Sequence, residues 1–210
     1  MADAIVTFLA FAAGFFAGRY LKCCICRFFH IQISAGSRWL ESGNGLLYVL
    51  VFLSQGFTAS AGMFCVCASL LLAVGIVDQR TFEIPAVLNL LIGGIGTVHL
   101  LFDLGQWQVY LAGMFAASSL LLLAHLISRG EGMGGGDIKL MAASGLLLGW
   151  QKIVLALLVG AAAGTVIHLL LMKFCAKERV LAFGPYLAFG IFTAMVYGDR
   201  ILDWYLLIFG

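Results

Sequence analysis

Apolar segments of roughly the length of a membrane-spanning helix follow one another along almost the whole chain. A bilayer core of roughly 30 Å requires about 20 apolar helical residues, and somewhat fewer where flanking residues adapt. The segments lie at residues 4–21, 45–57, 59–77, 84–102, 107–128, 138–150, 153–172 and 181–198. The second and sixth are short, and short apolar runs are also typical of re-entrant or interfacial segments. The pattern predicts an all-α fold, a polytopic transmembrane helical bundle of about eight spans.

The composition excludes an ordinary soluble domain. Of the 210 residues, 63% are hydrophobic and 10% are charged, against about 45–50% and about 25% in soluble domains. The sequence has no internal repeat and no linker, so we expect a single membrane-embedded domain over residues 1–210. The N-terminal segment lacks the basic start of a cleavable signal peptide, and we expect it to remain as the first helix. A net charge of +2 is too small to indicate nucleic acid as a partner.

The positions of the basic residues predict the orientation of the spans, because Lys and Arg accumulate in short cytoplasmic loops. With eight spans and an outside N-terminus, the cytoplasmic side receives Arg19, Lys22, Arg27, Arg38, Arg80, Arg129, Lys139, Lys173, Lys177 and Arg179. Only Lys152 and Arg200 fall on the other side. If residues 45–57 did not cross, the later loops would swap sides and the distribution would become even. We therefore expect eight spans, with Asp78 and Asp137 at the cytoplasmic face.

The acidic residues Asp3, Asp103, Asp199 and Asp203 fall on the opposite side in this topology. The last residues, 201–209, contain Trp204 and Tyr205, which are typical of an interfacial anchor.

Asp78 directly follows the apolar segment 59–77. Pro85 opens the next helix, where its missing N–H is not needed, so the loop between them is short and fixed. Charged side chains are common at the ends of membrane spans, and Asp78 alone is equally well explained as the polar end of a helix.

The second candidate is a GxGD sequence formed by Gly134, Gly135, Gly136 and Asp137 at the start of an apolar helix. Glycines allow another strand to approach the backbone closely, although a flexible loop is the alternative explanation. Two carboxylates brought together cannot both stay ionised, so one holds a proton while the other acts as a base on a shared water. Such a pair is suited to attack on an amide bond.

Other catalytic chemistries have less support. A metalloprotease needs an HExxH pair, and a serine protease needs a serine with a histidine partner. The four histidines, His30, His99, His125 and His168, are scattered, and we expect packed or interfacial imidazoles.

The cysteines do not predict a metal site. Cys65 and Cys67 lie in an apolar segment and are expected to be buried thiols. Cys23, Cys24 and Cys26 follow the first helix, but the second spaced pair that zinc sites normally have is missing. Cys175 stands alone.

These segments together resemble the type IV prepilin peptidases, membrane aspartic proteases of the GxGD class. The resemblance rests on four blocks in the family's order: GFFAGRYLKCCICRF (14–28), DQRTFEIP (78–85), GGGDIKLMAASGLLLGW (134–150) and FGPYLAFG (183–190). It implies that Asp78 and Asp137 are the catalytic pair. The supporting residues of the site would be Gly134, Gly135, Gly136 and Lys139. Lys139 would favour ionisation of the pair, and its alternative role is that of a plain cytoplasmic anchor.

The resemblance also implies the substrate and the location. Such an enzyme removes a short basic leader from type IV prepilins or type II secretion pseudopilins, cutting after a glycine. It lies in the bacterial cytoplasmic (inner) membrane, with its active site facing the cytoplasm. Its partners would be the leader, the N-terminal hydrophobic helix of the substrate and the lipid bilayer.

One departure from the family concerns cofactors. Many members carry a long cytoplasmic loop after the first helix, with two CxxC pairs linked to zinc and to N-methylation of the new terminus. Residues 27–44 of this chain form a short loop without cysteine. We therefore expect no zinc and no other cofactor, with S-adenosylmethionine needed only if methyltransferase activity is retained.

Two other classes of protein compete with a peptidase. Intramembrane carboxylates also mark ion pathways, so an ion- or proton-coupled transporter is one alternative. Transporters tend to have paired repeats and midplane charges, whereas here the acids lie at one face. A non-enzymatic component of a pilus or secretion machine is the other.

The charge distribution predicts that both termini face away from the cytoplasm. A reporter that is active only in the cytoplasm, fused to the C-terminus, should therefore be silent. Strong activity of this fusion would contradict the eight-span topology.

Overall fold

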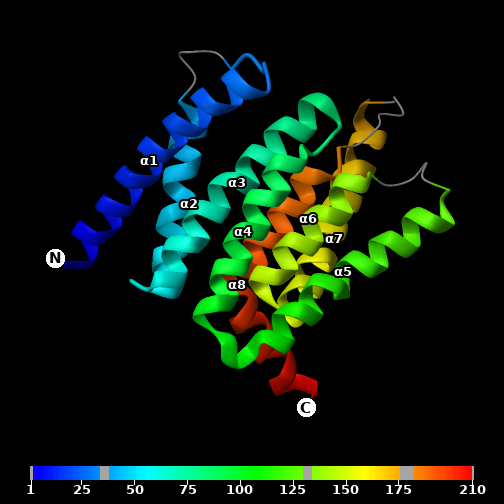
Figure 1. Ribbon diagram of the computed structural model, residues 1–210. Coiled ribbons are helices and arrows are strands. Elements are labelled where there is room, and N and C mark those ends of the chain that lie inside the picture. Colours follow the sequence, from blue (N-terminus) through cyan, green and yellow to red (C-terminus); the bar gives the residue numbers. More distant parts are fainter. Residues whose placement is uncertain (1, 34–37, 130–133, 176–181, 210) are drawn as a thin grey trace. The chain divides into compact units, whose positions relative to one another are not determined.

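The computed structural model describes residues 2–33, 38–129, 134–175 and 182–209. In these ranges the chain forms α-helices and one short 3₁₀ helix, with no strand. The elements are α1 (Ala2–Phe28), α2 (Trp39–Gln55), α3 (Ala59–Thr81), α4 (Ala86–Phe102), η1 (Leu104–Gln106), α5 (Trp107–Ile127), α6 (Gly135–Leu148), α7 (Trp150–Cys175) and α8 (Gly184–Phe209) (Figure 1). The predicted all-α fold class is confirmed. Lys177 and Arg179, and residue 181 at the start of the last predicted segment, lie outside the described residues.

The helices follow the predicted segments in order, but α2 begins six residues before the predicted start at residue 45. Polar residues in its first turns are buried and have partners. Glu41 lies 3.9 Å from the Lys22 ammonium, and the Asn44 amide donates a hydrogen bond of 2.8 Å to the Gly14 carbonyl. Because these groups are satisfied inside the protein, the helix can include them, and the loop after α1 is shorter than predicted.

The lengths of the helices agree with a membrane bundle. Among the described residues, four segments are long and apolar enough to cross a bilayer: Val6–Phe28, Ala59–Thr81, Leu104–Ile127 and Trp150–Lys173. The segment predicted at 138–150 belongs to α6, which has 14 residues and is therefore about 21 Å long, shorter than the bilayer core. α8 continues without a break to Phe209, so the tail at 201–209 extends that helix.

The chain divides into two compact units, residues 1–73 and 74–210. In the first, α1 packs along α2. The Ser69 hydroxyl donates to Asn44 Oδ1 at 2.9 Å, deep in this unit, and Cys65 and Cys67 are buried as predicted. Hydrogen bonds between helices help to hold membrane helices together, because lipid offers no partner to their polar groups. The single domain over residues 1–210 stays a prediction.

In the second unit, α6 packs against α4, α5, α7 and α8 (Figure 1). Its side chains Leu140, Met141 and Leu147 are almost completely buried. Gly145 of α6 lies against Gly113 of α5 so closely that a Cβ atom on either would overlap the backbone of the other. Small residues allow such close crossings of membrane helices. The short helix that carries Asp137 is therefore held on several sides.

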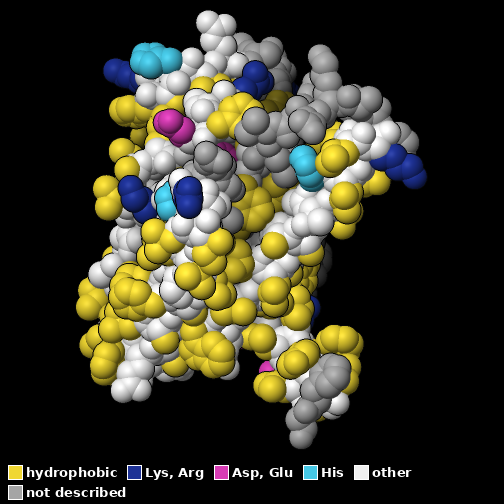
Figure 2. Space-filling model, turned by 90° about the vertical axis from the view of Figure 1, so that its right-hand side faces the viewer, with side chains coloured by type: hydrophobic (Ala, Val, Ile, Leu, Met, Phe, Trp, Pro, Cys, Tyr) yellow, Lys and Arg dark blue, Asp and Glu magenta, His cyan; other side chains and the backbone are white. Residues whose placement is uncertain are grey.

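Large hydrophobic side chains also lie on the outside of the second unit. Leu90, Phe115 and Leu158 are examples from α4, α5 and α7. Figure 2 shows hydrophobic side chains over much of the face that it draws. Such large exposed apolar surfaces are rare on soluble monomers and typical of surfaces that contact a membrane.

The close crossing of α5 and α6 is testable. Gly145→Ala should destabilise the protein by about 1–3 kcal/mol, because the new methyl group has no room against backbone atoms. The matched change is Gly94→Ala in α4, where a Cβ would meet nothing within 4 Å; this variant should be unchanged or slightly stabilised. Thermal unfolding in detergent measures both. Equal midpoints for the two variants would contradict the close contact.

Candidate active site

A cleft of about 440 Å³ opens in the second unit, within the size range of about 300–1,000 Å³ usual for ligand pockets. The end of α3, the loop after it and the first turns of α4 and α6 form its walls. The lining residues are Asp78, Phe82, Glu83, Ile84, Ala86, Gly134, Gly135, Gly136, Asp137 and Lys139. Every site residue predicted from the sequence is in this set.

Asp78 lies in the last turn of α3, whereas the sequence predicted that the helix ends at residue 77. The helix continues to Thr81, and the Phe82 N–H closes it by donating to the Asp78 carbonyl at 2.8 Å. The Asp78 side chain is buried. Its Oδ2 accepts a hydrogen bond of 2.8 Å from the backbone N–H of Gly184, at the start of α8. This bond fixes the orientation of the carboxylate.

The contact with Gly184 was not predicted. This glycine belongs to the block FGPYLAFG, for which the sequence suggested no role. A Cβ atom at Gly184 would lie 2.7 Å from Asp78 Oδ2, so any side chain there would displace the carboxylate. The sequence did contain a signal for this contact, the Gly-Pro pair at the start of a helix. The first N–H groups of a helix have no partner within it, so the Gly184 N–H was available as a donor.

Asp137 is the third residue of α6, after the N-cap residue Gly134. Its side chain is 7% exposed. Burial raises the pKa of Asp137 to about 6, the charge of Asp78 also raises it, and a hydrogen bond with the Gly134 backbone acts in the opposite direction. The charge of Asp78 therefore reaches Asp137, although the two residues come from different helices.

The glycines before Asp137 have different surroundings. A Cβ atom at Gly136 would lie 3.0 Å from the Ile84 side chain, whereas at Gly135 it would meet nothing within 4 Å. The Gly136 carbonyl accepts a hydrogen bond of 3.2 Å from the Asn89 side chain of α4. Gly136 is thus required for packing, while Gly135 leaves the backbone open to the cleft. Asn89 is a second residue that was not predicted.

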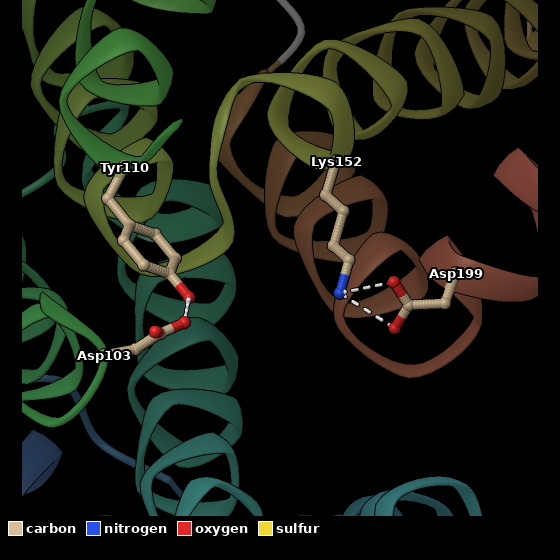
Figure 3. A network of polar contacts seen from close by, with 4 residues as sticks. All are labelled: Asp103, Tyr110, Lys152 and Asp199. Atoms are coloured by element: carbon tan, nitrogen blue, oxygen red, sulfur yellow. Dashed lines mark hydrogen bonds and ion pairs between the residues drawn. The ribbon is translucent and has the colours of Figure 1, made fainter. Parts of the chain in front are cut away.

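The acids predicted on the opposite side of the membrane include two with partners of their own. Asp103 accepts a hydrogen bond of 2.9 Å from the Tyr110 hydroxyl. The Lys152 ammonium lies 2.8 Å from Asp199, and each pair of side chains points toward one another (Figure 3). Neither acid lines the cleft. Asp203 of α8 is exposed.

Comparison with known proteins agrees with these features. A family model described as the type IV leader peptidase family matches residues 65–169, which is half of the chain and includes both cleft aspartates. The chain belongs to the type IV leader peptidase family. No solved structure matches it significantly.

Similar members of the family carry the name prepilin leader peptidase/N-methyltransferase. The protein of Aeromonas salmonicida (strain A449) is 34% identical over 193 residues, 86% of this chain and 65% of its own length. That of Pseudomonas aeruginosa is 30% identical over 196 residues, 88% of this chain and 65% of its own. That of Bacillus subtilis (strain 168) is 34% identical over 143 residues, 66% of this chain and 56% of its own. This chain therefore spans less than two thirds of the length of these relatives.

The raised pKa of Asp137 predicts a stability effect. A carboxyl group with a pKa of about 6 in the folded protein and 3.8 when unperturbed favours folding most below pH 3.8, and this contribution is lost as the pH rises to about 6. At neutral pH the ionised Asp137 therefore disfavours folding. Asp137→Asn should raise the thermal midpoint in detergent at neutral pH, and the gain should shrink in acid.

The matched control is Asp203→Asn, because Asp203 is exposed. It should show no comparable dependence on pH. A clear loss of stability in Asp137→Asn at neutral pH would contradict the raised pKa.

Proposed function

We propose that the chain is a membrane aspartic endopeptidase that removes the short basic leader of type IV prepilins or type II secretion pseudopilins, cutting after a glycine. The observation that carries the proposal is the cleft, in which the buried Asp78 and Asp137 lie beside the backbone of three glycines. It is supported by membership of the leader peptidase family.

The proposed mechanism uses the two carboxyl groups as an acid and a base around one water molecule. In the active state the pair carries one proton, and Asp137, whose pKa is raised, is the group that holds it. Asp78, oriented by the Gly184 N–H, takes a proton from water, and the water oxygen attacks the carbonyl carbon of the scissile bond. The Asp137 proton stabilises the developing oxyanion, and the departing amine takes the proton from Asp78. The pH dependence of turnover belongs to the pair, not to either residue.

The remaining cleft residues would place the peptide. Gly135 leaves a stretch of backbone open, against which an extended substrate segment can lie. Lys139 is exposed at the cleft, and its positive charge would favour the singly ionised state of the pair.

The same proposal specifies where the substrate helix lies, which side of the membrane the cleft faces and whether a cofactor is needed. The hydrophobic helix of the substrate would remain in the bilayer beside the exposed apolar side chains, in the bacterial cytoplasmic membrane. The cleft would face the cytoplasm. We propose no metal or other cofactor for the peptidase step, so a chelator should leave cleavage unchanged. S-adenosylmethionine would serve only a retained methyl transfer to the new terminus.

Replacing either aspartate tests the mechanism. Asp78→Asn and Asp137→Asn should each lower kcat by at least about 100-fold with little change in KM, because acid–base catalysis contributes about 10²–10⁴-fold. The assay uses the purified chain in detergent and a synthetic prepilin peptide, with the cut located by sequencing the new N-terminus.

Asp203→Asn is the matched control and should keep wild-type turnover. Asp103 and Asp199 are less suitable, because losing the contacts with Tyr110 and Lys152 would affect stability. If a well-folded Asp137→Asn protein cleaved the peptide at a rate near wild type, the aspartyl mechanism would be wrong. If wild type bound the peptide but never cleaved it, a transporter or a non-enzymatic pilus component would be the better explanation.

A further inference from the structure

Among the described residues, two charged side chains line the cleft besides the aspartates. Glu83 comes from the loop between α3 and α4, and Lys139 comes from α6. Both are exposed. The ion pairs found among the described residues, Lys22–Glu41 and Lys152–Asp199, involve neither of them. Charges that line a cleft act on a bound molecule more strongly than charges on an open surface, because the walls focus their field.

The backbone of Glu83 is held in place on both sides. The Thr81 hydroxyl accepts the Glu83 N–H at 3.3 Å and lies 3.0 Å from the Glu83 carbonyl oxygen. Phe82, the residue before it, has a φ of 56°, a left-handed conformation that is unfavourable for a bulky side chain. Strained residues persist where their surroundings determine them, and they cluster at functional sites.

The residues after Glu83 are equally constrained. Ile84 is 9% exposed and packs at Gly136, where an added Cβ would be 3.0 Å away. Pro85 follows with a φ of −60°, the value to which its ring restricts it. The loop therefore presents the Glu83 carboxylate from a fixed backbone rather than from a freely moving segment.

We propose that Glu83 is a specificity-determining residue that binds a cationic side chain of the substrate's leader. The proposal rests on the peptidase function above. A cationic group needs an acceptor of opposite charge, and the carboxylates among the described residues that line the cleft are Asp78, Asp137 and Glu83. A cation bound to Asp78 or Asp137 would form an ion pair with that carboxylate and hinder its action as an acid or a base on the water molecule. Glu83 can bind the leader without contacting the catalytic pair.

Lys139 would help to determine the direction in which the leader lies in the cleft. Its positive charge repels a cationic leader residue, while Glu83 attracts one, so the two elements that carry these charges act on a bound leader in opposite ways. A basic leader is therefore favoured toward the loop between α3 and α4 and disfavoured toward α6. Such complementary and repulsive charges together fix the register of a bound chain.

Three synthetic prepilin peptides test the proposal, identical except for one leader residue that is Lys, Gln or Glu. Wild type should prefer the Lys peptide. Glu83→Gln should raise KM for the Lys peptide by about two- to fivefold, as expected for the loss of one exposed ion pair, with kcat nearly unchanged. It should leave KM for the Gln peptide unchanged. Glu83→Lys should prefer the Glu peptide.

The peptide preference of Glu83→Lys distinguishes charge recognition at this position from a distortion of the cleft by the substitution. A distorted cleft would cleave all peptides less well, but it would not gain a preference for the Glu peptide. Asp203→Asn should keep the wild-type order of peptides. An unchanged KM for the Lys peptide in Glu83→Gln, or an equal rise for all three peptides, would overturn the role of Glu83 while leaving the peptidase function intact. If wild type cleaved none of the three, the proposed function itself would fail, and the role of Glu83 with it.

Discussion

Two carboxyl groups held next to each other, largely out of water, are the constraint on which the second unit depends. Removing a carboxylate from water disfavours its charge, and a neighbouring carboxylate disfavours it further. Both effects act on Asp137. The protein keeps Asp78 in a defined position with a backbone N–H from α8 and places Asp137 in the first turn of α6, where the partial positive charge of a helix N-terminus favours an anion. The pKa of Asp137 stays raised, and in the proposed mechanism this raised pKa allows Asp137 to act as an acid beside Asp78.

The rest of the unit provides the rigidity that such a pair requires. α6 is shorter than the bilayer core is thick and is held by the helices around it, one of them through the close crossing at Gly113 and Gly145. The hydrogen bond from Asn89 to the Gly136 carbonyl ties its first turn to α4. A catalytic group displaced by about 1 Å loses much of its effect, so glycines that allow close packing contribute to the proposed chemistry without touching a substrate.

The proposed division of labour within the cleft follows from burial. Asp78 and Asp137 are buried, and the raised pKa of Asp137 suits proton transfer. The exposed charges of Glu83 and Lys139 suit recognition of a charged peptide. The same loop that ends α3 just after Asp78 also carries Glu83, so the position of the base and the position of the recognition group are set by one short segment. Substrate orientation and catalysis would therefore be coupled through backbone geometry.

The amino-acid sequence by itself determined the all-α fold, the order of the helices and six of the residues that line the cleft, the two aspartates, the three glycines and Lys139. These depend on apolar runs, on a GxGD sequence and on a short loop before Pro85, all of which are local in the chain. Only the tertiary structure decided that α2 begins at Trp39, that α6 is an interior helix and that Gly184 and Asn89 belong to the site. The bond between Gly184 and Asp78 joins residues 106 positions apart, and the buried partners of Glu41 and Asn44 lie in other helices. Whether a polar residue can be buried, and which backbone N–H reaches a carboxylate, depends on how helices pack against one another, and no local pattern carries that information.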